Sequence, residues 1–178
     1  MTAVKNGLRK TPDITVHIKP LEGFLFKNKE IKFGMSQREI ENLLEKPEEF
    51  EVSNLSKGIT ESRDAADFFY WFQGDYIINY GIEQLRSLDV PLESGIRIFY
   101  KDIDILNDEE AVSKLSQYDT PTADDGKYMN FYELGICLGG YGRKKLFRGK
   151  IVTLFSRVDI KYFEILYKEG GEEISHKN

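Results

Sequence analysis

Runs of apolar and β-branched residues, some of them alternating with polar ones, predict most of the strands in this chain. Such runs are typical of strands that bury one or both faces. A two-residue turn at Gln73-Gly74 is predicted to join the second and third strands as a hairpin. The predicted strands cover Ile14–Ile18, Phe68–Phe72, Asp75–Tyr80, Ile96–Tyr100, Tyr128–Leu138, Lys150–Ser156 and Tyr162–Tyr167.

The run Phe68–Phe72 consists entirely of aromatic residues. Because successive residues of a strand point to opposite faces, both faces of this strand are aromatic. Either both faces are buried, or one of them is an exposed surface of the kind that binds partners through aromatic anchors.

Helical spacing and capping residues predict two short helices. Ser36 and Glu39 form a capping box before the first helix, and Pro47 follows its end. Asn107 and Asp108 precede the second helix as capping residues. The predicted helices cover Gln37–Leu44 and Glu109–Leu115.

A short capped helix followed by aromatic strands occurs twice along the chain, which predicts an α+β fold with antiparallel sheets. One arrangement has two tandem halves, residues 13–106 and 107–170, between flexible tails at 1–12 and 171–178. The alternative is a single α+β domain over residues 13–170. Tyr80-Gly81-Ile82 and Leu134-Gly135-Ile136 occupy comparable places, but this similarity is too short to establish a repeat.

The composition is that of a globular chain that folds without disulfides. Of its 178 residues, 40% are hydrophobic and 13% aromatic, and Cys137 is the single cysteine. The net charge of −5 does not favour non-specific binding to nucleic acid or to an anionic membrane. No signal-like segment is visible, and no apolar run approaches the roughly 18 residues of a membrane span. We therefore expect a cytoplasmic protein.

Residues suited to catalysis or metal binding are few. His17 and His176 are the two histidines, and with one cysteine they give a poor ligand set, so we predict no metal site and no cofactor. The glycine-rich run Leu138–Lys145 lacks the spacing of a phosphate-binding loop and is better explained as a hairpin connection. The pairs Asp102 with Asp104 and Asp124 with Asp125 fit a solvated acidic surface better than an acid–base pair.

Charge is unevenly distributed along the chain. Between Lys101 and Asp125 eight acidic residues face two lysines, whereas between Arg143 and Lys161 seven basic residues face one aspartate. An acidic surface that also bears tyrosine can imitate a polyanion such as a nucleic acid, and it raises the rate at which a basic partner associates with it. Ordinary charge clustering is the alternative. The predicted partner-binding residues are Asp102, Asp104, Tyr118, Asp119, Asp124 and Asp125.

Two stretches resemble known families. The pattern Gly34-Met35-Ser36-x-x-Glu39-Ile40-x-x-Leu43-Leu44-x-x-Pro47 resembles the opening of the small αβ unit of β-lactamase-inhibitor proteins. The second half is similar to immunity proteins of bacterial polymorphic and contact-dependent-inhibition toxins, on residues Phe99–Asp104, Asp108–Val112, Asp119, Pro121, Phe131–Ile136 and Val152–Phe155.

The second resemblance implies a non-catalytic protein that binds the C-terminal domain of a cognate toxin and blocks its active site. A nuclease toxin fits best, because nucleases have basic substrate clefts. The resemblance implies no direct contact with nucleic acid and none with a membrane. Two alternatives stay open: another protein-binding or scaffold module, and a hydrolase that uses carboxylates.

Overall fold

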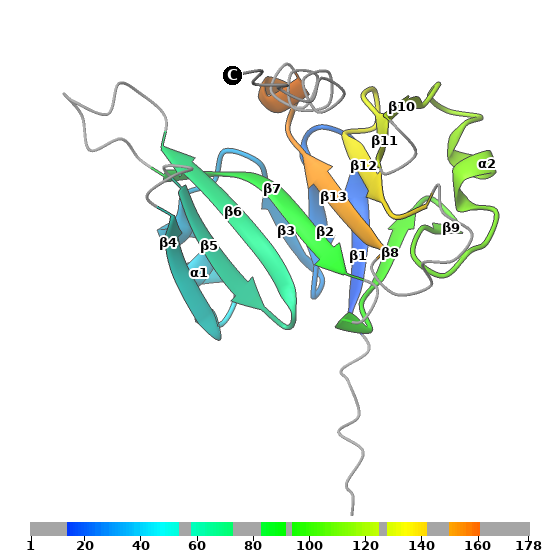
Figure 1. Cartoon of the computed structure of the whole chain (residues 1–178). Helices are drawn as coiled ribbons and strands as arrows, with labels where there is room; N and C mark the ends of the chain where they lie inside the picture. The colour runs from blue at the N-terminus through cyan, green and yellow to red at the C-terminus, as the bar shows by residue number, and fades with distance from the viewer. Residues whose placement is uncertain are drawn as a thin grey trace, which may run out of the picture.

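The computed structural model describes residues 14–53, 58–72, 83–91, 94–124, 128–141 and 150–160. These residues form two sheets and two short α-helices, which confirms the predicted α+β class (Figure 1). The first sheet has the order β3-β2-β1-β8-β9. Its strands are β1 (Thr15–Lys19), β2 (Gly23–Phe26), β3 (Lys29–Lys32), β8 (Arg97–Tyr100) and β9 (Ile103–Asp104). All pairs in it are antiparallel except β1 with β8.

The second sheet is antiparallel and has eight strands in the order β10-β11-β12-β13-β7-β6-β5-β4. Because β7 pairs with β13, this sheet contains strands from both of the halves considered above, and their division stays a prediction. Its strands are β4 (Glu49–Ser53), β5 (Gly58–Arg63), β6 (Ala66–Phe72), β7 (Glu83–Pro91), β10 (Thr122–Asp124), β11 (Tyr128–Phe131), β12 (Ile136–Gly139) and β13 (Ile151–Phe155).

The main core lies between the two sheets, with the first sheet behind the second in Figure 1. Phe68 of β6 makes edge-to-face contacts with Phe24 and Phe26 of β2, at ring-centroid distances of 5.9 and 5.4 Å. Phe68 and Tyr70 are therefore buried on this inner face, and Phe69 is half-buried on the opposite face. The side chains of Trp71 and Phe72 lie outside the described residues.

The predicted strand Phe68–Phe72 is confirmed within β6, whereas the turn predicted at Gln73-Gly74 lies outside the described residues. Both edges of β6 are already occupied, by β5 on one side and by β7 on the other, with Phe72 opposite Glu83. The predicted strand Asp75–Tyr80 lies outside the described residues, as does Tyr162–Tyr167. The partner that follows β6 along the chain is β7, a strand that the sequence pattern did not predict.

The single strand predicted over Tyr128–Leu138 is wrong, because it is a hairpin. Strands β11 and β12 are joined by a turn at residues 132–135. Gly135 has φ +65°, and an added Cβ would lie 2.6 Å from the carbonyl oxygen of Phe155, so the turn requires glycine there. The predicted strands at Ile14–Ile18, Ile96–Tyr100 and Lys150–Ser156 are confirmed as β1, β8 and β13 within one or two residues.

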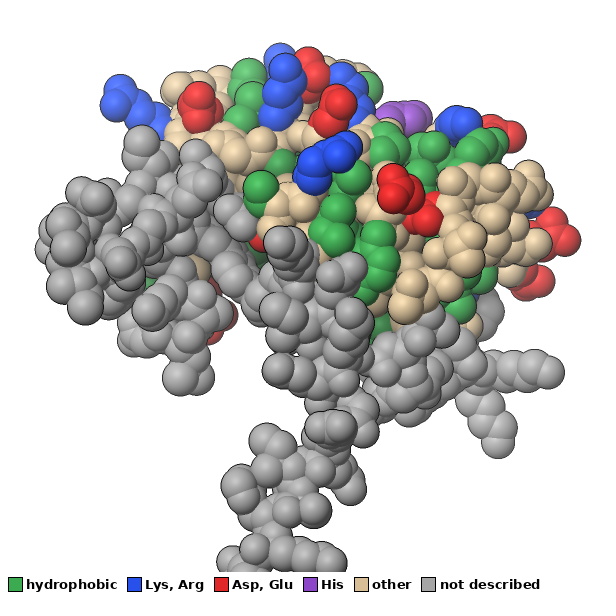
Figure 2. Space-filling view, turned by 90° about the horizontal axis from the view of Figure 1, so that it is seen from above, with side chains coloured by type: hydrophobic (Ala, Val, Ile, Leu, Met, Phe, Trp, Pro, Cys, Tyr) green, Lys and Arg blue, Asp and Glu red, His purple; other side chains and the backbone are tan. Residues whose placement is uncertain are grey.

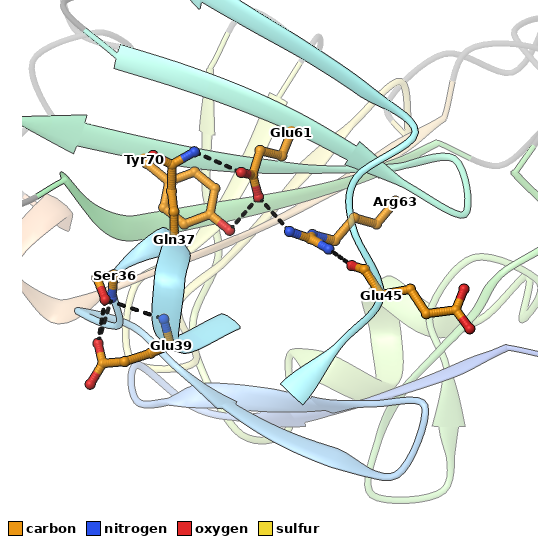
Figure 3. Close-up of polar contacts among 7 residues, drawn as sticks. All are labelled: Ser36, Gln37, Glu39, Glu45, Glu61, Arg63 and Tyr70. Carbon is orange, nitrogen blue, oxygen red and sulfur yellow. Dashed lines mark hydrogen bonds and ion pairs between the residues drawn. The ribbon is translucent and has the colours of Figure 1, made fainter. Parts of the chain in front are cut away.

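Helix α1 (Gln37–Leu43) begins with the predicted capping box, shown in Figure 3. The Glu39 amide donates to Ser36 Oγ, and the Ser36 amide donates to a Glu39 carboxylate oxygen at 2.8 Å. The hydrogen bonds that the Ser36 amide and the Ser36 hydroxyl donate to this carboxylate lower the pKa of the Glu39 carboxyl. The helix ends where Leu44 becomes extended, three residues before Pro47.

We expect Ser36→Ala to lower the free energy of unfolding by about 1 kcal/mol, because the Glu39 amide then loses its acceptor. Urea denaturation monitored by circular dichroism measures this effect. Ser113→Ala, at an exposed position inside the second helix, is the matched control and should leave the midpoint nearly unchanged. Equal midpoints for the Ser36 variant and the unaltered chain would contradict the capping role.

Helix α2 (Ala111–Leu115) is confirmed, but it begins later than predicted. Its N-cap is Glu110, which makes no side-chain capping bond. Asp108 instead accepts from the Glu110 amide and from Lys114 Nζ, at 2.9 and 2.6 Å, so it ties the preceding turn to the helix. Lys114 and the amide of Glu110 together lower the pKa of the Asp108 carboxyl.

Candidate functional site: an acidic sheet edge

The strand β4 is the last strand of the eight-stranded sheet over the described residues, and it carries two exposed apolar side chains. Phe50 is 56% exposed and Val52 is 50% exposed. They lie opposite Glu61 and Ile59 of β5, which are both buried, so all four belong to the inner face of the sheet. At this edge the inner face is therefore open, although elsewhere it packs against the first sheet.

The chain segment that contains these two apolar residues is rich in exposed acidic side chains. All eight charged residues between positions 38 and 52 are exposed, and six of them are glutamates, so the segment has a net charge of −4. We call residues 38–52 the acidic sheet edge. Its charged residues are Arg38, Glu39, Glu41, Glu45, Lys46, Glu48, Glu49 and Glu51.

An open groove runs between α1 and β4. Gln37, Arg38 and Glu41 line it from the helix, and Phe50 and Glu61 line it from the sheet. Its walls thus combine an exposed aromatic ring with charged side chains of both signs, over a floor that contains a buried carboxylate.

The Glu61 carboxylate at this floor is held by three donors (Figure 3). Gln37 Nε2 of α1 donates to one oxygen at 2.6 Å, and the other oxygen accepts from Arg63 at 2.8 Å and from the Tyr70 hydroxyl at 2.9 Å. Glu61 and Arg63 are 1% and 3% exposed. Because buried charges require partners, these bonds fix both the carboxylate and the helix above it.

Arg63 extends the same network to the chain that follows α1. Its guanidinium donates to the backbone carbonyl of Glu45, and it lies 5.8 Å from the centre of the Phe68 ring. Burial, together with the Glu61 carboxylate, raises the pKa of the Tyr70 hydroxyl, so Tyr70 stays a donor. Helix α1, strand β5 and the chain leading into β4 are therefore tied together under the groove.

No family model, curated protein or solved structure matches this chain. The geometry of its own residues is thus the basis for assigning a function.

Of the partner-binding residues predicted from the sequence, Asp102, Asp104, Tyr118 and Asp119 lie elsewhere, around α2. Asp102 and Tyr118 are exposed, and Lys101 Nζ lies 3.8 Å from the centre of the Tyr118 ring. Asp104 is paired with Arg97 at 2.8 Å, and Asp119 accepts from the Glu133 amide at 2.8 Å, so these two carboxylates make structural contacts. The side chain of Asp124 and all of Asp125 lie outside the described residues, as do positions 142–149 of the basic segment.

The described surface around that region is mixed in charge. The face seen in Figure 2 carries Lys and Arg side chains interspersed with Asp and Glu, and ion pairs show that both signs of charge also occur near α2. Lys101, Arg97 and Lys114 lie among the acidic residues near α2. The net negative charge of the sequence segment is thus partly neutralised in space, and Asp102 and Tyr118 stay predictions as contact residues.

A row of polar residues crosses the outer face of the eight-stranded sheet. Asp67, Asp89, Thr153, Cys137 and Asn130 lie directly opposite one another on β6, β7, β13, β12 and β11. Burial raises the pKa of the Asp89 carboxyl to about 6; a hydrogen bond from Thr153 opposes this rise and the charge of Asp67 adds to it. Among the described residues, the buried Asn130 amide has no hydrogen-bond partner, nor has one oxygen of Asp89.

The remaining chemical candidates are placed as follows. His17 lies on the exposed face of the first sheet, stacked on Phe99 at 5.3 Å, and Cys137 is buried in β12. Among the described residues there is no group of three or more potential metal-ligating side chains, and no helix there is long and apolar enough to cross a membrane. His176 and the second half of the glycine-rich run, positions 142–145, lie outside the described residues.

Proposed function

We propose that this chain is an immunity protein, which uses its acidic sheet edge to bind a toxin domain and block the toxin's active site. The observation that supports this proposal most directly is that Phe50 and Val52 are exposed within a segment that also carries six exposed glutamates. Protein interfaces concentrate binding energy in a few apolar or aromatic anchors within a polar rim. The acidic sheet edge favours a basic partner, such as the substrate cleft of a nuclease.

The fixed floor of the groove also supports a binding role. The three donors to Glu61 and the contact of Arg63 with Glu45 hold α1 against β5 before any partner arrives. A surface that is already ordered loses less conformational entropy on binding. An immunity protein must capture its toxin quickly, and long-range attraction between a −4 segment and a basic cleft raises the association rate.

The proposal is tested by the growth of bacteria that produce the toxin encoded next to the gene for this chain, with and without this chain. We expect the unaltered chain to restore growth and to purify as a complex with the toxin. Absence of both results would overturn the immunity role, whereas a complex with an unrelated protein would indicate a scaffold module.

A pair of variants identifies the surface used. Phe50→Ser with Glu51→Gln should weaken the complex at least tenfold, because loss of a central anchor costs on the order of 1–2 kcal/mol or more. Asp102→Asn with Tyr118→Ser, at the exposed positions near α2, is the matched control and should change affinity far less. The reverse order of effects would assign binding to the α2 surface instead. Calorimetric titration of each purified variant with the toxin domain gives the comparison.

A further inference from the structure

Strand β4 leaves one side unpaired among the described residues, because β5 occupies only its other side. The open edge of a sheet presents backbone N–H and C=O groups that pair readily with another extended chain. Phe50 and Val52 are each at least half exposed, so within the described part of the chain the inner face is not fully covered at this edge.

The side chains of β4 sort by charge onto two faces. Glu49 and Glu51 are exposed on the outer face, opposite Ser62 and Thr60, and Phe50 and Val52 lie on the inner face beside the groove. A chain added to this edge alternates in the same way, so every second residue meets a glutamate and the others meet an apolar side chain.

We propose that the acidic sheet edge binds its partner by strand addition, and that the added segment is an extended one in which basic residues alternate with apolar residues. This inference rests on the proposed function and specifies the partner segment that it requires. Opposite charges on directly opposed residues of neighbouring strands stabilise pairing, and like charges oppose it. A second copy of β4 would place glutamates beside glutamates, so the charge pattern favours a different, basic chain over self-pairing.

The groove beside β4 suits the apolar side of such a segment. Phe50 and the aliphatic parts of the Arg38 and Glu41 side chains line the groove and offer this side of the segment apolar contact. Because Glu61 is already satisfied by three donors, the added strand meets no unpaired charge at the floor.

A synthetic peptide of alternating lysine and valine, seven residues long with blocked ends and a fluorescent label, tests the mode of binding on the full chain. We expect saturable binding by fluorescence anisotropy and slower amide exchange in Glu49–Ser53. A peptide with the same side chains but N-methyl groups at alternate backbone nitrogens should bind at least about tenfold more weakly, because it loses strand hydrogen bonds. Equal binding of the two peptides, or no binding of the first, would overturn strand addition.

Charge exchange supplies the second arm of this test. The double variant Glu49→Lys with Glu51→Lys should no longer bind the lysine–valine peptide and should bind a glutamate–valine peptide instead. Asp102→Lys with Glu109→Lys makes the same change in net charge at exposed positions away from β4, and should keep the original preference. If both double variants switch their preference from the lysine–valine peptide to the glutamate–valine peptide, net charge alone determines binding and the proposal is overturned. Growth protection by the unaltered chain is a separate readout, so immunity can hold even where strand addition fails.

Discussion

Replacing Arg63 with methionine is expected to lower the free energy of unfolding by about 3–5 kcal/mol. Arg63 is 3% exposed and lies 2.8 Å from Glu61, which is 1% exposed. Methionine fills much of the same volume but leaves the Glu61 carboxylate buried without its positive partner. Urea denaturation at pH 7, followed by fluorescence and circular dichroism together, measures the loss.

Two further variants show whether the burial of the charge causes this loss. Lys19→Met removes the cation from an exposed pair with Glu30, whose nitrogen–oxygen distance is 2.6 Å, and should change the free energy of unfolding far less than Arg63→Met does. Adding Glu61→Gln to the Arg63 variant should restore part of the stability, because it removes the unpaired charge. A loss below about 1 kcal/mol for Arg63→Met would contradict a fixed floor under the groove.

The same buried charges explain why the sequence did not predict β5. On its inner face this strand places Ile59, Glu61 and Arg63, so two of its three buried side chains are charged. A pattern that expects apolar residues at alternate positions treats this segment as polar loop. Its tight turn to β6 was equally hidden, because Asp64 and Ala65 adopt positive φ without a glycine.

A bulge concealed β7. The pairing with β6 shifts between Phe69 and Tyr70, so that Leu85 and Leu88, three residues apart, both face the core. This spacing breaks the two-residue period of a strand. Strand β13 keeps a regular two-residue period, and the sequence predicted it correctly. The sequence also predicted the start of α1 correctly, because Ser36 and Glu39 are both present to form the capping box.

The acidic sheet edge was missed for a different reason. Its glutamates are visible in the sequence, but on a helix and in a polar stretch they indicate only a solvated surface. Their importance depends on β4 being an edge strand and on Phe50 being exposed, and both follow from the pairing of distant strands. The acids near α2 stood out in the sequence because Arg97, which lies outside the acidic segment, pairs with Asp104 only in the folded chain.

The second large effect is expected from Asp89→Asn, which should raise stability at neutral pH. Burial raises the pKa of the Asp89 carboxyl from about 3.8 to about 6, so the folded chain holds this proton more tightly than the unfolded chain. The stability contributed by the protonated carboxyl is complete below pH 4 and is lost as the pH rises through 6. A shift of this size corresponds to about 3 kcal/mol between the two limits.

Measurement of unfolding free energies from pH 3.5 to 8 for the unaltered chain and for Asp89→Asn isolates this contribution. Glu30, Glu39 and Asp108 have lowered pKa values, so the stability that their carboxylates contribute to the folded chain is lost as the pH falls. Both proteins share this loss, so only the difference between their unfolding free energies reports on Asp89. We expect this difference to grow in favour of asparagine between pH 4 and 7. Asp67→Asn, the control at the opposite position on β6, should give a smaller gain, because it removes only the weaker contribution. If the difference in unfolding free energy between the two proteins does not change with pH, Asp89 titrates normally. If the difference grows in favour of asparagine as the pH rises, the ionised Asp89 carboxylate destabilises the folded chain at neutral pH.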